Sequence, residues 1–201
     1  MNNSAFFAYL TRLRWITRWG LMRNANPENV MEHSWEVAVI AHTLALIKNR
    51  YFGGQVDANA VTTAALYHDV TEVITGDLPT PIKYHSTAIQ QAYKAIEQQA
   101  AQALLKLLPE DLQTDFQPLF SPQDAASAER DALIKMADKI SAYLKCKAEL
   151  QAGNQEYSSA AEELLKKIQN SPLPEVDYFM KVFAPACGLT LDQLMKPDAV
   201  G

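Results

Sequence analysis

The chain has 201 residues, of which 48% are hydrophobic and 20% charged, a balance that predicts one globular domain and excludes an intrinsically disordered protein. Its formal net charge of -5 excludes a global basic field that would draw it to polymeric nucleic acid or to an anionic membrane, although a local pocket can still bind a small anion. We expect a cytoplasmic protein, because the sequence shows no secretory leader, no apolar stretch of membrane-spanning length and only two cysteines without paired spacing.

Helical periodicity dominates the sequence and predicts an all-α fold. Near the start, Phe6, Leu10 and Leu13 recur at steps of three and four residues, which predicts a short amphipathic helix that ends near Gly20. A second helix is predicted from about residue 29 to about residue 50. Its middle is apolar on nearly all sides, as is typical of a helix at the centre of a bundle.

A third helix is predicted over residues 58–75, with Asp57 as its N-cap and Gly76 as its end. Residues 76–85 contain two prolines and a glycine, so we expect a constrained loop there rather than a helix.

The second half of the chain continues the helical pattern. A long helix is predicted over residues 86–108, followed by a Pro-rich turn and by another helix over residues 128–153. Two further helices are expected, interrupted at residues 171–175 and at Pro185. No composition shift or flexible linker divides the chain, so we predict a compact helical bundle.

The adjacent pair His68 and Asp69 lies late in the predicted third helix, within the segment LYHDVTEV. Such a dipeptide arises by chance in roughly one chain in five of this size, so its surroundings carry the information. A polar pair that faces an apolar interior needs a partner to offset its desolvation, and a metal ion is one such partner. Glu72 follows one helical turn later, within reach of a metal-bound water.

A mononuclear metal site needs further ligands, and polar residues isolated in apolar stretches offer them. His33 lies on the core face of the second predicted helix, and Asp138 has small or apolar neighbours within IKMADKISAY. From these residues alone, separate helix caps and ion pairs, such as one between Asp138 and Lys135, explain the pattern equally well.

The order of a histidine, an HD pair and a distant aspartate on separate helices resembles the HD-domain metal-dependent phosphohydrolases. More specifically, the chain resembles the bacterial 5'-deoxynucleotidases of YfbR type in the segments RWGLMRN, ENVMEHS, YHDVTEVITGDLPTPIKY, KMADKISAYLKC and VDYFMKVFAP. The resemblance spans nearly the whole chain and implies a single HD domain over residues 1–201. It also implies a homodimer that removes the phosphate from 5'-deoxyribonucleoside monophosphates, with little activity on ribonucleotides.

Carried over position by position, the resemblance implies one divalent metal ion per subunit, held by His33, His68, Asp69 and Asp138. Two imidazoles and two carboxylates suit first-row transition metals better than calcium, and the resemblance favours Co2+ or Mn2+. Zinc and magnesium remain compatible with the ligand types.

The resemblance also implies contacts to the substrate phosphate and base. Arg18 would orient the phosphate through its fork of donors, and the alternative is a surface arginine on the first helix. Trp19 would pack against the nucleotide, and the alternative is core filling. This chain departs from the family pattern at Gly20, where a proline is expected, which would loosen the turn after Trp19.

The sugar is expected to lie against the loop after the third predicted helix. There Asp77 would accept a hydrogen bond from the 3'-hydroxyl, while Leu78, Pro79 and Thr80 would form a wall that excludes a 2'-hydroxyl; the alternative is a turn that merely ends a helix. The metal ligands expected to contact the substrate as well are His33, Asp69 and Asp138.

These residues suggest a metal-assisted hydrolysis. The metal would activate a water for in-line attack, Glu72 would act as general acid or base, and Arg18 would offset charge on the phosphoryl oxygens. One alternative is an HD-type enzyme that hydrolyses a cyclic nucleotide, a guanosine polyphosphate or a nucleoside triphosphate. The other is a nucleotide sensor without catalysis, against which the presence of both Glu72 and Arg18 argues.

Overall fold

A computed structural model describes residues 3–120 and 125–196 of the chain. The predicted all-α class is confirmed: within these ranges there is no strand, and the one extended pairing is an isolated antiparallel bridge between Thr17 and Asn29. Residues 1–2, 121–124 and 197–201, which belong to the predicted domain and in part to the predicted Pro-rich turn, lie outside the described residues.

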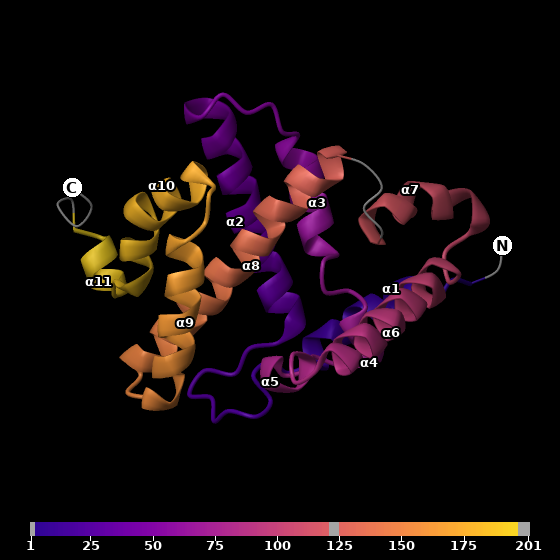
Figure 1. Ribbon diagram of the computed structural model, residues 1–201, viewed down its shortest axis with the longest axis horizontal. Helices are drawn as coiled ribbons and strands as arrows, with labels where there is room; N and C mark the ends of the chain where they lie inside the picture. The colour runs from indigo at the N-terminus through magenta and orange to yellow at the C-terminus, as the bar shows by residue number, and fades with distance from the viewer. Residues whose placement is uncertain (1–2, 121–124, 197–201) are drawn as a thin grey trace.

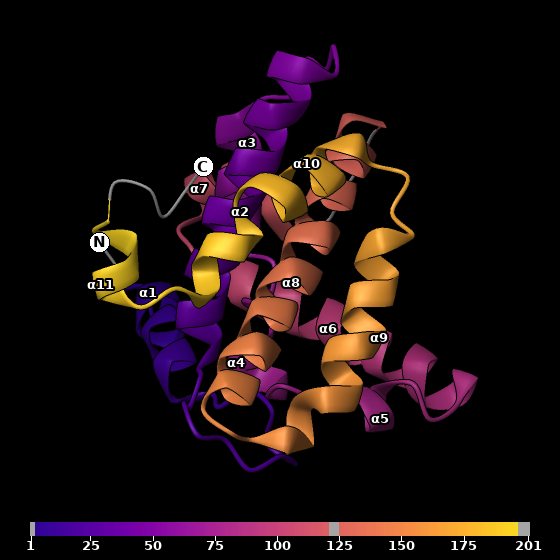
Figure 2. The same ribbon diagram turned by 90° about the vertical axis from the view of Figure 1, so that its left-hand side faces the viewer.

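The centre of the bundle is formed by two long helices that cross, α2 (Val30–Tyr51) and α8 (Ala125–Gln151) (Figure 1). α3 (Ala58–Leu66) packs along α2, while α9 (Ser158–Gln169) runs beside α8 and α10 (Pro174–Val182) lies against α2 (Figure 2). The remaining elements are α1 (Phe6–Leu10), η1 (Thr11–Trp15), α4 (Glu72–Thr75), α5 (Thr80–Lys83), α6 (Thr87–Leu105), α7 (Glu110–Phe120), η2 (Gln155–Tyr157), η3 (Ala184–Gly188) and α11 (Leu191–Leu194).

The main core lies where α2, α3, α8 and α10 meet. Its largest fully buried side chains include Val37, Leu44, Val61, Leu133 and Ile140. Burying each such side chain contributes about 1.5–3 kcal/mol, so this layer fixes the crossing of α2 and α8, on which the site depends.

The predicted starts of two helices are confirmed by their caps. The side chain of Asn29 accepts a hydrogen bond from the backbone N–H of Glu32 at the start of α2. Asp57 accepts from the N–H groups of Asn59 and Ala60 at the start of α3. Each cap satisfies amides that the first helical turn leaves unpaired.

The prediction of one continuous helix over residues 58–75 is wrong. α3 ends at Leu66, and a series of tight turns over residues 67–71 leads into the short α4. The carbonyl of Ala65 accepts from both the backbone N–H and the ring Nδ1 of His68, which draws the chain out of the α-helical pattern. His68 and Asp69 therefore lie in a turn rather than on a helix.

Two further helices form where loops were predicted. α7 occupies most of the expected Pro-rich turn; its first turn carries Glu110 and Asp111, which favour a helix N-terminus, and it contains Pro118. α5 forms inside the expected loop because Pro81 stands in its first turn, where a missing N–H costs no helical hydrogen bond. Within the described residues, no helix is both long and apolar enough to cross a membrane.

Candidate metal and phosphate site

The structure brings the four predicted metal ligands together from three distant parts of the chain. His33 comes from the first turn of α2, His68 and Asp69 from the turn after α3, and Asp138 from the middle of α8. Ligand atoms of His33, His68 and Asp138 all lie within 4.8 Å of one another. An Oδ2 atom of Asp69 lies 3.1 Å from Nε2 of His68 and 3.6 Å from Nε2 of His33.

The donor atoms fit a divalent metal ion. Two metal–ligand bonds of about 2.1 Å that meet at a right angle place their donor atoms about 3 Å apart. Nε2 of His33 lies 3.1 Å from Oδ1 of Asp138, close to that spacing. Among the described residues, neither this nitrogen nor Nε2 of His68 makes an aligned hydrogen bond, although both are buried. Two buried nitrogens with lone pairs directed at a shared point are what a cation requires.

Hydrogen bonds behind the rings set the orientation of both imidazoles. Nδ1 of His68 lies 2.8 Å from the carbonyl oxygen of Ala65, which can only accept, so Nδ1 carries a proton and, in the neutral ring, the lone pair is on Nε2. Nδ1 of His33 lies 3.1 Å from the hydroxyl of Ser141, whose own proton is donated to Glu36. Such contacts orient a ligand before the metal binds.

The charges at the site keep both aspartates ionised. Burial alone would raise the pKa of Asp69, but attraction by His68, His33 and Arg18 outweighs it and holds this pKa well below its usual range. Burial opposes ionisation of Asp138 as well, yet the close approach of His33, whose Nε2 lies 3.1 Å from Oδ1, and attraction by His33 and His68 hold the pKa of Asp138 below its ordinary value. Both carboxylates are therefore available as anionic ligands at neutral pH.

Arg18 lies beside these ligands. Its Nη1 is 3.4 Å from Oδ2 of Asp69, its Nε is 3.0 Å from Oε2 of Glu28, and its side chain is only 12% exposed. Burial lowers the pKa of this guanidinium, but Asp69, Glu28 and Asp138 raise it more, so the group stays charged. Arg18 is thus a fixed cation next to the candidate metal centre, not a side chain on the open surface.

Trp19 occupies an unusual backbone conformation. Its φ of 59° lies in the left-handed region, which bulky residues rarely adopt, whereas the following Gly20 shows no positive φ. The indole N–H donates to Oε2 of Glu28 at 3.0 Å, and the ring packs against Tyr157 with centroids 5.2 Å apart. This packing agrees with the core-filling alternative for part of the ring, and the stacking of Trp19 on a base stays a prediction.

Glu72 opens α4 and is 7% exposed. Burial first, and then repulsion from Asp69 and Asp77, raises the pKa of Glu72 to about 9. Its Oε2 is buried without a hydrogen-bond partner among the described residues. A carboxyl group so perturbed beside a ligand set is a candidate for proton transfer.

The loop that is predicted to border the sugar, residues 77–80, follows α4 closely in the sequence. Asp77 is half-buried near Arg18; burial raises its pKa, while Arg18 and the backbone N–H of Trp19 oppose that rise. Leu78 and Pro79 are half-buried, and Thr80, which begins α5, is exposed. Their contact with a sugar stays a prediction.

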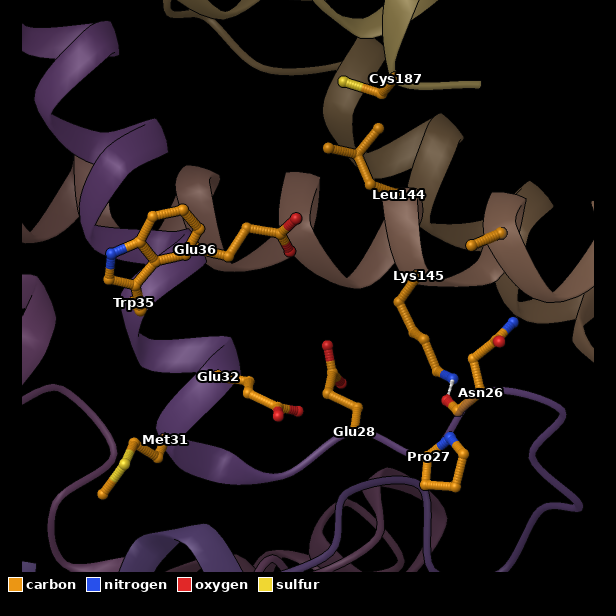
Figure 3. A pocket seen from close by; sticks show the side chains of 11 residues that line it. Asn26, Pro27, Glu28, Met31, Glu32, Trp35, Glu36, Leu144, Lys145 and Cys187 are labelled. Atoms are coloured by element: carbon orange, nitrogen blue, oxygen red, sulfur yellow. Dashed lines mark hydrogen bonds between the residues drawn. The ribbon is translucent and has the colours of Figure 1, made fainter. Parts of the chain in front are cut away.

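Sequence reasoning missed three polar residues that support the site: Glu28, Glu36 and Ser141. Glu28 and Glu36 line a groove of about 720 Å³ between the start of α2 and α8, together with Trp35 and Lys145 (Figure 3). Of the described residues, those that line this groove include none of the four predicted metal ligands. The one signal for Glu36 and Ser141 was their spacing, each three residues after a predicted ligand, since both can otherwise pass for ordinary helix residues.

Comparison with known proteins agrees with the geometry. A family described as 5'-deoxynucleotidase YfbR-like matches residues 5–187. The chain belongs to this family. Among its relatives is a protein of Photorhabdus laumondii called 5'-deoxynucleotidase plu3092, which is 51% identical over 191 residues, covering 95% of this chain and 96% of the relative.

Solved structures show that the fold of this YfbR-like chain is the HD-domain bundle. An HD-domain phosphohydrolase from Listeria innocua superposes with a TM-score of 0.77 at 24% identity, covering 90% of this chain and 87% of that one. The cyanophage S-2L HD phosphohydrolase DatZ superposes with a TM-score of 0.58 at 23% identity, covering 91% and 96%. That cyanophage structure holds dA and one catalytic Zn2+ ion.

Proposed function

We propose that this protein is a 5'-deoxynucleotidase that hydrolyses 5'-deoxyribonucleoside monophosphates to deoxyribonucleosides and phosphate. The observation that carries the proposal is the position of Arg18. Its guanidinium lies 3.4 Å from a carboxylate of the ligand set, in a chain of the YfbR-like family. A phosphate donor beside a metal centre is the arrangement that phosphate-ester hydrolysis needs.

The metal would be held by His33, His68, Asp69 and Asp138. A divalent cation bound there supplies Lewis-acid activation of a water and neutralises charge on a phosphate oxygen. We favour Co2+ or Mn2+, which suit a mixed nitrogen and oxygen ligand set. Zn2+ deserves a parallel test, since it is the ion in the cyanophage structure.

The residues of the site then have separate roles in the reaction. Arg18, held through Nε by Glu28, directs the rest of its guanidinium at the phosphoryl oxygens. Glu72 takes the proton from the attacking water or gives one to the departing 5' oxygen. His33, Asp69 and Asp138 border the phosphate as well as the metal.

Specificity for deoxyribose would come from the loop after α4. We propose that Asp77 accepts a hydrogen bond from the 3'-hydroxyl and that Trp19 packs against the nucleoside. A wall formed by Leu78, Pro79 and Thr80 would leave no space for a 2'-hydroxyl. The pyrrolidine ring of Pro79 stiffens this wall, which makes exclusion by shape effective.

We further propose that the protein is a cytoplasmic homodimer, as its resemblance to the family implies. A mass in solution of twice the 22.4 kDa of the chain, measured by light scattering, is the expected result. A monomer at micromolar concentration would contradict it.

The activity is tested by measuring phosphate release from a panel of deoxyribonucleoside and ribonucleoside monophosphates with Co2+, Mn2+, Zn2+ or Mg2+, and with a chelator. We expect release from the deoxy substrates, loss with chelator, and little release from the ribo substrates. Release only from cyclic nucleotides, guanosine polyphosphates or nucleoside triphosphates would overturn the substrate assignment. Tight binding of nucleotide without any release would point to a sensor.

A further inference from the structure

His33 is held from behind by two side chains that sequence reasoning did not assign to the site. Nδ1 of His33 lies 3.1 Å from Oγ of Ser141, and the hydroxyl of Ser141 donates to Oε2 of Glu36. His33 and Ser141 are almost completely buried, with 1% and 0% of their surface exposed. The chain His33–Ser141–Glu36 therefore connects a candidate metal ligand with the groove beside α2.

The three residues are held by the crossing of the two central helices. His33 and Glu36 are one turn apart on α2, and Ser141 is one turn after the candidate ligand Asp138 on α8. Figure 3 shows the carboxylate of Glu36 pointing from α2 toward α8. This packing gives Ser141 one hydrogen-bond neighbour on each side.

The number of available protons decides the direction of the hydrogen bonds that join His33, Ser141 and Glu36. A hydroxyl has one hydrogen, and the hydrogen of Ser141 goes to the carboxylate of Glu36. The oxygen of Ser141 can then only accept from His33, so the ring proton must be on Nδ1. In the neutral ring the lone pair is then on Nε2, which lies 3.1 Å from Asp138 Oδ1, on the ligand side of the ring.

We propose that Glu36 and Ser141 are positioning residues, which hold His33 as the Nδ1–H tautomer and aim its Nε2 at the metal. For His68 the backbone carbonyl of Ala65 does the same task, and no side-chain substitution removes it. The support of His33 can therefore be removed by substituting Ser141 or Glu36, whereas the support of His68 cannot. We expect the affinity of the site for metal to fall when Ser141 or Glu36 is replaced. The proposal rests on the ligand set of the proposed function, but not on the substrate or the reaction.

The tautomer is measured directly in metal-free protein by nitrogen NMR of the histidine rings. We expect His33 to be the Nδ1–H form in the native chain and to become a mixture of tautomers in Ser141→Ala and Glu36→Leu. His68 serves as the internal control and stays Nδ1–H in both variants. Glu36→Gln keeps an acceptor oxygen for the serine and retains the native tautomer. An Nε2–H form of His33 in the native chain, or no change in Ser141→Ala, would overturn the proposal.

Metal affinity is measured by titration with Co2+ alone against a competing chelator. We expect about 10- to 100-fold weaker binding in Ser141→Ala and in Glu36→Leu, the range typical of residues that support a ligand. The double variant should bind no more weakly than the weaker single variant, because both substitutions break the same chain. Additive losses would mean two unrelated effects and would overturn the proposal.

The matched control is Glu32→Leu, a substitution one turn earlier on α2 and in the same groove. It should leave both the tautomer and the Co2+ affinity unchanged, and circular dichroism should show all variants folded. If Glu32→Leu weakened Co2+ binding as much as Glu36→Leu does, the effect would come from the negative charge of the groove. The positioning role of Ser141 and Glu36 would then be refuted. If native protein binds Co2+ and shows these differences but releases no phosphate, the proposed function fails while the positioning role stands.

Discussion

A single carboxylate, Glu28, holds both residues that we expect to contact the substrate next to the metal. Its Oε2 accepts from Nε of Arg18 and from Nε1 of Trp19, each at 3.0 Å, and its backbone carbonyl accepts the N–H of Arg18 at 3.0 Å. The left-handed φ of Trp19 costs roughly 1–2 kcal/mol, which these contacts offset. A strained backbone held by a half-buried carboxylate indicates that the position of these two side chains matters.

Removing this carboxylate should misplace the guanidinium without disturbing the metal. We expect Glu28→Ala to lower kcat/KM for a deoxyribonucleoside monophosphate by about 10- to 100-fold, since small errors in orientation are costly. Steady-state kinetics and a Co2+ titration give the two readouts. Glu32→Ala, an exposed glutamate of the same groove, is the control and should behave as the native protein. Native kcat/KM in Glu28→Ala would refute this role.

Glu72 and Asp138 should separate catalysis from metal binding. Glu72→Ala is expected to lower turnover by about 100- to 10,000-fold, the usual contribution of a general acid or base, while Co2+ affinity is kept. Asp138→Asn removes a ligand charge, so both Co2+ affinity and turnover should fall together. Single-turnover phosphate release alongside Co2+ titration distinguishes them. Turnover at the native rate in Glu72→Ala with normal metal binding would remove Glu72 from the mechanism.

Among the secondary-structure elements, the broken helix between α3 and α4 has the largest effect on the site. Adjacent residues of a continuous helix point about 100° apart, which would direct an imidazole and its neighbouring carboxylate away from one point. In the turn over residues 67–71, Oδ2 of Asp69 instead comes within 3.1 Å of Nε2 of His68. The turn thus lets two consecutive residues direct their donor atoms at one candidate metal position.

The loop after α4 is tied to α6, where Tyr93 donates to the carbonyl of Gly76 at 3.4 Å and contacts Thr75. This support fixes the position of Asp77. We expect Asp77→Ala to lower the ratio of kcat/KM for deoxy over ribo substrates at least about tenfold, because a looser site no longer rejects the added hydroxyl. Paired assays on dAMP and AMP measure it, with the exposed Asp111→Ala as control. An unchanged ratio would place the discrimination elsewhere.

At the scale of the whole molecule, a buried carboxylate ties the loop before α2 to the far end of α8. Glu149 is fully buried and accepts from the backbone N–H groups of Ala25 and Asn26 at 2.8 and 2.9 Å, from Asn154 at 2.8 Å, and from Lys145. This loop leads into Glu28 and α2. Glu149 therefore stabilises the segment that places Arg18 beside the candidate metal centre.

Folding stability should depend on this group in acid. Burial opposes ionisation of Glu149, but its hydrogen bonds to Lys145, Asn154 and the backbone lower the pKa to about 2. Since the folded pKa is below the unfolded value of about 4.3, the stability it adds is complete above about pH 5 and is lost as pH falls toward 2.

Glu149→Gln is expected to cost about 3 kcal/mol at pH 7, because it leaves the charge of Lys145 buried and unpaired. Urea unfolding at pH 7 and pH 3 should show that the difference from the native protein narrows in acid. Glu162→Gln, an exposed change on α9, is the control and should cost nothing at either pH. A loss of unfolding free energy in Glu149→Gln that is as large at pH 3 as at pH 7 would contradict the assigned pKa of Glu149.

The sequence by itself determined the fold class, the two central helices and the identity of the four ligand candidates. Helical periodicity reports which residues face the core, and the caps at Asn29 and Asp57 mark where helices begin, because these are local properties of the chain. Spacing and resemblance were enough to select His33, His68, Asp69 and Asp138.

Only the tertiary structure decided how those residues meet and what supports them. The turn at His68 depends on a hydrogen bond to Ala65. The roles of Glu28 and Ser141 depend on partners that are 9 to 108 residues away in the sequence. Such contacts leave no periodic trace, since a glutamate near a helix start looks the same whether it faces water or a buried guanidinium. The crossing of α2 and α8 is what converts a list of polar residues into a site.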